Sequence, residues 1–288
     1  MLRRPARDFG GTMTGSFNLF GDDGRGPHHS VNFVTVHDGF TLYDLFSYDQ
    51  KQNGCGPLNP VCCDDPTSPF CDRVSGEDNN RSRDWGQNAE PFKRQQMRNL
   101  FAATVLAQGT PMILGGDEWM RTQLGNNNAY STRADNPYAW YQWGTYQASN
   151  ERKRMHDFVR QLLALRKQHA WAFAASGYDA PPTWLDAGGG TSPNWGGRHI
   201  ALRYDHPTGG PTLMVLINLE LGPVDFQLPA GSWSRLLDTQ QWFDDQPYFD
   251  QSGADVTRSA NVSLGSPEAV AGSTYGVPSR AIVVLVSG

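Results

Sequence analysis

A histidine and an aspartate that stand side by side at the end of an apolar run are the residues of this chain best suited to chemistry. Residues 31–37 read VNFVTVH and predict a β-strand, after which come Asp38 and Gly39. In a parallel β/α barrel, a polar pair at the C-terminal end of a strand points into the mouth where active sites are built. There the pair would supply a fixed negative charge beside a hydrogen-bonding ring. The alternative is a strand cap and a turn, because Asp-Gly is common in turns.

A second strand also ends in carboxylates. Residues 110–114 form a short apolar run that leads into Gly115, Gly116, Asp117 and Glu118. Adjacent residues of a strand point to opposite sides, so at most one of the two acids can face the mouth. We therefore expect Asp117 and Glu118 to be structural or to contact a substrate, and not to act as a catalytic acid and nucleophile.

The loop that follows is rich in polar side chains. Its candidate binding residues are Arg121, Asn126, Asn127, Asn128 and Tyr130. Their amides and guanidinium suit an array of hydroxyl groups, and Tyr130 or Trp119 could stack on a flat ligand. The alternative is a rigid loop whose Asn side chains bond their own backbone. A weaker cluster of the same kind comprises Asn79, Asn80, Arg81 and Trp85.

All four cysteines fall in one stretch rich in Gly, Pro and Asp. They are Cys55, Cys62, Cys63 and Cys71. One or two disulfides that staple this long loop are the favoured interpretation, which would place the chain in an extracellular or periplasmic compartment. Zinc is the competitor, but intervals of six, zero and seven residues lack paired C-x-x-C knuckles. Free thiols are the third possibility.

The elements that must position these residues alternate between strand and helix in the first part of the chain. Residues 3–30 predict loop, and a short helix should run from Thr41 to about residue 49. A long irregular excursion covers 50–88, and longer helices are expected at 90–108 and 151–169, with a loop at 119–148. A strand, a helix and a second strand in this order predict a βαβ unit of a parallel sheet.

The pattern changes from about residue 172. Short apolar or alternating runs cover 198–204, 211–219, 223–228, 233–237 and 277–287. Turn residues separate them, which predicts an antiparallel β-sandwich. We place the domain boundary at 174/175, so that 1–174 is α/β and 175–288 is all-β.

Bulk composition narrows the class of partner. The chain has 288 residues, of which 38% are hydrophobic and 18% charged, with a formal net charge of -5. This charge gives no bias toward nucleic acid or acidic membranes, and no apolar run is long enough for a membrane span. We expect a globular protein whose partners are neither nucleic acid nor membrane.

Three segments together resemble the isoamylase-type debranching enzymes of the alpha-amylase clan of glycoside hydrolases. These segments are residues 32–39 (NFVTVHDG), 109–118 (GTPMILGGDE) and 126–130 (NNNAY). The resemblance covers nearly the whole chain from about residue 15 to 286. It implies the last two strand-helix units of a (β/α)8 barrel, with residues 31–37 as the seventh strand and 110–114 as the eighth, followed by the sandwich.

The same resemblance assigns roles and shows what is missing. It implies that Asp38 holds the hydroxyls of the sugar being cleaved and that His37 hydrogen-bonds the same ring, which stabilises an oxocarbenium-like transition state. The family's nucleophilic aspartate and general-acid glutamate lie on the fourth and fifth strands, and no position here matches them. A whole barrel takes roughly 250 residues. We therefore expect a fragment that is inactive alone.

Two functions from different classes follow. The leading one is a fragment of a hydrolase of α-1,6 branch linkages in glycogen or amylopectin, whose partners are a branched α-glucan or maltooligosaccharide and the missing N-terminal part of the enzyme. The alternative is a non-catalytic glucan-binding protein, and a Cys-rich metal-binding module is a third reading. No cofactor is expected; calcium occurs in this clan, but no suitable ligand cluster stands out in these residues.

Overall fold

The computed structural model describes residues 6–53, 76–129, 140–241 and 261–288. They divide into two compact units. The site unit comprises Phe33–Met97 and Ile113–His156, and the sheet unit comprises Arg98–Met112, Asp157–Gly288 and the described residues of Leu2–Asn32. The four cysteines and Tyr130 lie outside the described residues. The division follows the packing of the chain, and the boundary expected at 174/175 stays a prediction.

The sheet unit holds an antiparallel sheet of six strands in the order β3-β4-β5-β10-β7-β8, and β6 pairs with β9 in a second sheet. The bounds are β3 (Thr183–Leu185), β4 (His199–Tyr204), β5 (Leu213–Asn218), β6 (Val224–Gln227), β7 (Trp233–Asp238), β8 (Glu268–Val270), β9 (Thr274–Val277) and β10 (Ala281–Ser287). The five predicted strands are confirmed as β4, β5, β6, β7 and β10. The sequence pattern missed β3, β8 and β9, which have only three or four residues each.

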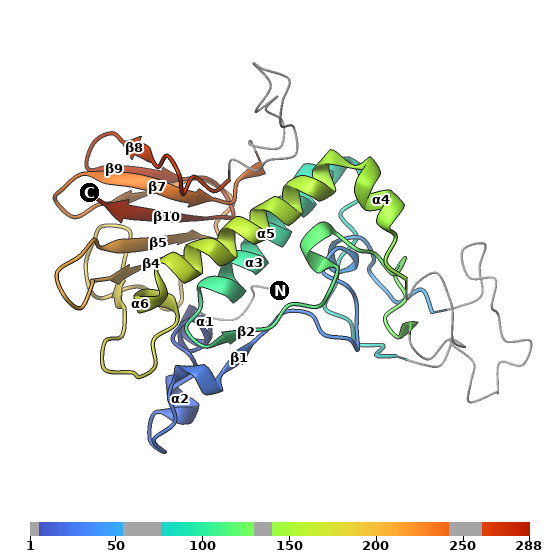
Figure 1. Ribbon diagram of the computed structural model, residues 1–288, viewed down its shortest axis with the longest axis horizontal. Coiled ribbons are helices and arrows are strands. Elements are labelled where there is room, and N and C mark those ends of the chain that lie inside the picture. The colour runs from blue at the N-terminus through green and yellow to red at the C-terminus, as the bar shows by residue number, and fades with distance from the viewer. Residues whose placement is uncertain (1–5, 54–75, 130–139, 242–260) are drawn as a thin grey trace, which may run out of the picture. The chain divides into compact units, whose positions relative to one another are not determined.

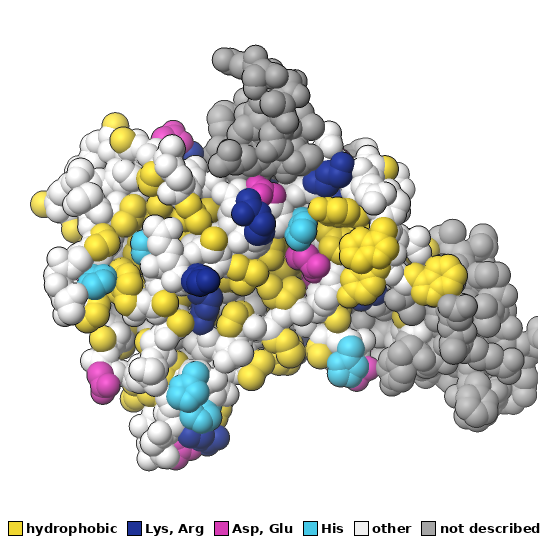
Figure 2. Space-filling model, viewed as in Figure 1, with side chains coloured by type: hydrophobic (Ala, Val, Ile, Leu, Met, Phe, Trp, Pro, Cys, Tyr) yellow, Lys and Arg dark blue, Asp and Glu magenta, His cyan; other side chains and the backbone are white. Residues whose placement is uncertain are grey.

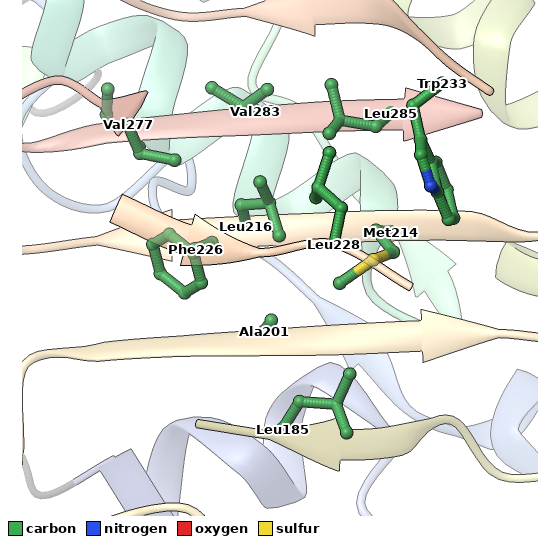
Figure 3. Packing of buried hydrophobic residues seen from close by; sticks show 11 residues of the cluster. Leu185, Ala201, Met214, Leu216, Phe226, Leu228, Trp233, Val277, Val283 and Leu285 are labelled. Atoms are coloured by element: carbon green, nitrogen blue, oxygen red, sulfur yellow. The ribbon is translucent and has the colours of Figure 1, made fainter. Parts of the chain in front are cut away.

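One hydrophobic core joins these two sheets. Leu216 of β5 and Val283 of β10 pack in the same cluster as Phe226 of β6 and Val277 of β9. Figure 3 shows these side chains between the strands that carry them. Because alternate residues of a strand point to one face, the cluster takes every second residue of β5, Met214 and Leu216.

The opposite face of the large sheet is buried as well. All six residues of β5 are buried, including Leu213, Val215 and Ile217. Part of the cover comes from α6 (Ala170–Phe173), since the ring of Phe173 meets Tyr204 of β4 edge-on at 5.3 Å. A strand covered on both faces reads as a continuous apolar run, which is how LMVLIN reads in the sequence.

A parallel strand pair accompanies this sheet. β1 (Val31–Asn32) lies beside β2 (Thr110–Pro111), and α3 (Glu90–Leu106) comes between them in the chain (Figure 1). The βαβ order is as predicted, but the strands are much shorter than the expected 31–37 and 110–114. Within the described residues each of them pairs only with the other, and an isolated pair of strands is only marginally stable.

The first thirty residues are not simply loop, which corrects the sequence prediction. They contain α1 (Ala6–Met13) and α2 (Phe17–Phe20). Gly10 and Gly11 inside α1 disguised the helix, because glycine disfavours helices. Gly10 has a packing reason: a Cβ there would come within 2.8 Å of the ring of Trp195.

The site unit contains mostly loops and short turns. Its regular elements are the start of α3, the start of α5 (Asn150–Gln168) and α4 (Trp143–Ala148). Both long helices are confirmed to within two residues, whereas α4 falls in a predicted loop. The helix expected from Thr41 is a single turn, η2 (Asp44–Phe46), although the Thr41 hydroxyl does accept a hydrogen bond from the Asp44 amide at 3.2 Å. Among the described residues, no helix combines the length and apolar character that a membrane span needs.

Candidate functional site

All the described candidate residues belong to the site unit. His37 and Asp38 lie on a short loop whose side chains are open to solvent, 77% and 62% exposed. The His37 Nε2 and Asp38 Oδ2 atoms are 3.4 Å apart. Gly39 follows with φ +128°, a conformation that side chains rarely adopt, so glycine is required to turn the chain here. The polar pair is therefore presented outward on a turn and is available to a ligand.

Asp117 fixes both ends of this loop. It is only 1% exposed, and its Oδ2 accepts a hydrogen bond from the Thr35 hydroxyl at 2.5 Å while its Oδ1 accepts one from the Leu42 amide at 2.9 Å. Burial raises the pKa of Asp117 to about 7, against the lowering effect of these hydrogen bonds and of the Arg121 charge. With both oxygens engaged, Asp117 acts as the structural anchor of the loop that carries His37 and Asp38.

The Asn segment holds the middle of the same loop. The Gly39 amide donates to the carbonyl oxygen of Asn127 at 2.9 Å. The segment that carries residues 37–39 and the Asn segment 126–128 are thus neighbours in the structure. The loop is therefore bonded before the polar pair at Thr35 and after it at Gly39 and Leu42, while the side chains of His37 and Asp38 stay exposed.

The side chains of two of the three asparagines are used inside the protein. Asn127 is 1% exposed, and it exchanges hydrogen bonds with Asn53: the Asn53 Nδ2 donates to Asn127 Oδ1 at 2.8 Å, and the Asn127 amide donates to Asn53 Oδ1 at 2.9 Å. Asn126 is fully buried, and its Oδ1 accepts from the Asn128 amide at 2.9 Å. Asn128 is half-buried. The alternative of a rigid polar loop describes Asn126 and Asn127.

The weaker cluster is only partly assembled. Asn80 joins the Asn network, because the Asn127 Nδ2 donates to Asn80 Oδ1 at 2.9 Å. Asn79 and Arg81 are exposed, and Trp85 packs edge-on against Phe92 with ring centroids 4.8 Å apart. Trp85 is thus a packing residue, whereas Asn80 supports the loop that carries Asn127.

Glu118 and Arg121 lie on the turn that follows Asp117. The Glu118 Oε2 accepts from the Gly116 amide at 2.7 Å, so this carboxylate folds back on its own segment. Arg121 is 7% exposed, and its backbone amide donates to the Gly116 carbonyl at 2.9 Å. Gly116 has φ +97°, and a Cβ there would lie 2.6 Å from Arg121 Cδ. Only glycine at this position therefore leaves room for the Arg121 side chain.

A second buried carboxylate, Asp44, was missed by the sequence interpretation. It is fully buried and accepts hydrogen bonds from the Thr122 hydroxyl at 2.5 Å and from the Gln123 amide at 2.8 Å. Burial raises the pKa of the Asp44 carboxyl. The signal in the sequence was an aspartate inside the apolar run Leu42–Phe46, a position that an acid occupies only when its hydrogen bonds are satisfied.

The described carboxylates Asp44, Asp117 and Glu118 do not form a pair that could catalyse a reaction or bind a metal ion. Asp44 and Asp117 are buried and engaged, and Glu118 bonds its own backbone. Within the described ranges, no three His, Cys, Asp or Glu side chains cluster so that they could hold a metal ion. The side chains of His37 and Asp38, by contrast, are exposed.

Comparison with known proteins gives this geometry a context. No protein-family model matches the chain. An isoamylase from Flavobacterium sp is 33% identical to this chain; the match covers 96% of this chain and 35% of the isoamylase. A glycogen operon protein GlgX homolog from Mycobacterium tuberculosis is 38% identical; that match covers 56% of this chain and 21% of the homolog. A pullulanase from Anoxybacillus sp. LM18-11, solved with maltotetraose, superposes with a TM-score of 0.58 at 18% identity, covering 96% of this chain and 30% of that protein. The chain thus spans about a third of the length of the isoamylase it matches.

Proposed function

We infer that this chain, a homologue of the isoamylase and GlgX debranching enzymes, corresponds to the C-terminal part of a hydrolase of α-1,6 branch linkages in α-glucans. The likeness to the Flavobacterium isoamylase over 96% of the chain supports the assignment. The share of that relative that the chain spans, 35%, supports the view that further parts are needed for catalysis.

The finer fold assignment follows from the same inference. We take β1 and β2 as the seventh and eighth strands of a (β/α)8 barrel, with α3 as the helix between them. Their parallel pairing and the βαβ order support this. The domain boundary at 174/175 falls in the interval between the end of α6 at Phe173 and the start of β3 at Thr183.

Asp38 and His37 would hold the sugar ring at the bond that is cleaved. Glycoside hydrolysis passes through an oxocarbenium-like transition state, which gains from a fixed negative charge and from hydrogen bonds to the ring hydroxyls. Asp38 suits the first role and His37 the second. The observation that carries the proposal is the Gly39–Asn127 hydrogen bond of 2.9 Å, together with the Asp117 anchor, because they hold this exposed pair in a fixed position without using its side chains.

The remaining catalytic groups would come from the part of the enzyme that this chain does not match. Hydrolysis with retention needs two carboxyl groups about 5 to 5.5 Å apart, one protonated and one ionised. The described acids around the loop, Asp44, Asp117 and Glu118, are all engaged in hydrogen bonds of the fold. The chain by itself should therefore lack hydrolytic activity.

The test is to compare the chain alone with a joined protein. In the joined protein, the chain is fused to the part of the Flavobacterium isoamylase that it does not match, and new reducing ends released from amylopectin are measured. We expect activity only in the joined protein, and its loss in the joined Asp38→Asn variant. Debranching by the chain alone, or full activity of the joined Asp38→Asn variant, would refute the proposal.

A further inference from the structure

Among the exposed aromatic side chains of the site unit, Tyr141 and Trp143 lie against each other. Tyr141 is 43% exposed and Trp143 is 58% exposed, with ring centroids 5.4 Å apart and planes that differ by 14°. Figure 2 shows hydrophobic side chains gathered on the surface near the start of α4, the helix that Trp143 begins. Contiguous exposed apolar patches with a polar rim are a feature of ligand-binding and interaction sites.

The aromatic pair rests on a rigid base. Trp119, which is 3% exposed, lies beneath it with its centroid 5.9 Å from that of Trp143 and 6.1 Å from that of Tyr141. Tyr146 meets Trp119 edge-on at 5.8 Å. Arg152 holds the same turn, since its guanidinium donates to the carbonyl oxygens of Trp119 and Met120. A preorganised surface loses little conformational entropy when it binds a ligand.

This base corrects one expectation about stacking. The sequence offered Trp119 as an aromatic face for a ligand, but its rings are covered by Tyr141, Trp143 and Tyr146. In this segment, Tyr141 and Trp143 are exposed where Trp119 is not. Trp119 supports them from below.

A buried cation beside the pair has spare hydrogen-bonding capacity. The guanidinium carbon of Arg121 lies 5.7 Å from the centroid of the Tyr141 ring, and the side chain is nine-tenths buried. Its Nε has no hydrogen-bond partner among the described residues. A buried donor of this kind costs free energy unless a ligand or water satisfies it. A hydrogen-bond donor next to an aromatic ring suits a ligand that has a flat apolar face and polar groups around its edge.

Tyr141 also lies against the segment that leads to Asp117. A Cβ on Gly115 would lie 2.4 Å from the Tyr141 hydroxyl, so Tyr141 sits directly over this glycine. Gly115 begins the segment that carries Asp117, the anchor of the His37 and Asp38 loop. A larger residue at position 115 would push the Tyr141 hydroxyl away from this segment.

We propose that Tyr141 and Trp143 form a subsite on which a glucosyl unit of an α-glucan stacks, with Arg121 donating a hydrogen bond to the sugar. A pyranose ring has one face of C–H groups and a rim of hydroxyls, which matches flat aromatic rings next to a buried donor. The inference rests on the proposed function for the identity of the ligand. It goes beyond it by locating binding of a neighbouring sugar unit outside the His37 and Asp38 pair.

The test uses the full chain and maltoheptaose, with binding measured by isothermal titration calorimetry. Trp143→Leu and Tyr141→Leu keep apolar volume but remove the flat ring, and we expect each to weaken binding by about tenfold or more, whereas Trp143→Phe should bind nearly as the wild type does. Arg121→Gln should also weaken binding. Leu221→Ala is the matched control, because Leu221 is 70% exposed and belongs to the sheet unit.

Two outcomes would overturn the subsite. They are no binding of maltoheptaose by the wild-type chain and unchanged affinity in both leucine variants. A change of oligomeric state in those variants, with affinity unchanged, would show that the patch contacts protein. In the joined protein, Trp143→Leu should raise KM for a maltooligosaccharide-branched substrate with kcat unchanged. An inactive joined protein whose chain still binds through Trp143 would reject the proposed function and leave the subsite standing.

Discussion

The Gly39 amide donates a hydrogen bond of 2.9 Å to the carbonyl oxygen of Asn127, two residues that stand far apart in the sequence. This bond joins the loop of His37 and Asp38 to the Asn segment, and Asp117 adds the contacts to Thr35 and Leu42. A fixed charge stabilises a transition state best when its position is set before the reaction. These hydrogen bonds all involve the backbone or flanking residues, so the side chains of His37 and Asp38 stay exposed, with their Nε2 and Oδ2 atoms 3.4 Å apart.

The first prediction concerns Asp38. In the joined protein, Asp38→Asn should lower kcat on amylopectin by about 10²- to 10³-fold, the cost of removing one charge that stabilises a transition state. The free energy of unfolding should change by less than about 0.5 kcal/mol, since Asp38 is 62% exposed. Reducing-end assays and urea unfolding check the two halves. A fall in activity matched by a fall in stability would point to a structural role instead.

The second prediction concerns the pH dependence of stability through Asp117. Its pKa is raised from 3.8 to about 7, so the protonated carboxyl stabilises the fold below its unfolded pKa, and this contribution is lost as pH rises through about 7. Asp117→Asn keeps the neutral form at every pH. The stability of the wild type relative to this variant should fall by at most about 4 kcal/mol between about pH 4 and pH 8.

Urea unfolding at several pH values measures this difference. Asp78→Asn serves as the control, because Asp78 is 87% exposed and its substitution should leave the wild-type profile in place. Parallel profiles for the wild type and Asp117→Asn would show that the carboxyl is ionised throughout.

The third prediction concerns Asp44. Asp44→Ala leaves the Thr122 hydroxyl and the amides of Gln123 and Gly125 without their acceptor inside the protein. We expect a loss of about 2 to 4 kcal/mol in the free energy of unfolding. Asp44→Asn, which retains one acceptor oxygen, should lose less. The exposed variant Asp78→Ala is the control, and an equal effect of Asp78→Ala and Asp44→Ala would contradict the assigned network.

The fourth prediction concerns the core of the sheet unit. Phe226 is 1% exposed and belongs to the cluster shared by the two sheets. Phe226→Ala should destabilise the protein by about 3 to 5 kcal/mol through the cavity that it leaves. Leu221→Ala, on a side chain that is 70% exposed, should change stability by less than about 0.5 kcal/mol. Thermal or urea unfolding distinguishes the two, and similar values would place Phe226 outside the core.

The local pattern of apolar residues predicted much of the secondary structure. The period of apolar residues located α3 and α5 to within two residues, and alternating or apolar runs located β4, β5, β6, β7 and β10. Pattern failed where an element was very short, as in β8, or where a residue chosen for packing disguised it, as Gly10 did in α1. Short elements form through neighbours in space, which local sequence does not describe.

The site shows the same limit more sharply. The sequence singled out His37, Asp38, Asp117 and the asparagines, and their roles in binding stay predictions. It could not say that Asp117 and Asn127 would be buried, because their partners Thr35 and Asn53 are 82 and 74 residues away in the chain.

By itself, the sequence determined the kinship with isoamylase and GlgX enzymes, the antiparallel sheet, the long helices and the polar pair at residues 37 and 38. Only the tertiary structure decided which polar and aromatic groups face solvent: Asp38 and Trp143 do, whereas Asp117 and Trp119 do not. The physical reason is that residue type and the spacing of apolar residues determine structure over a few neighbouring positions. Burial depends instead on contacts between segments that meet only when the chain has folded.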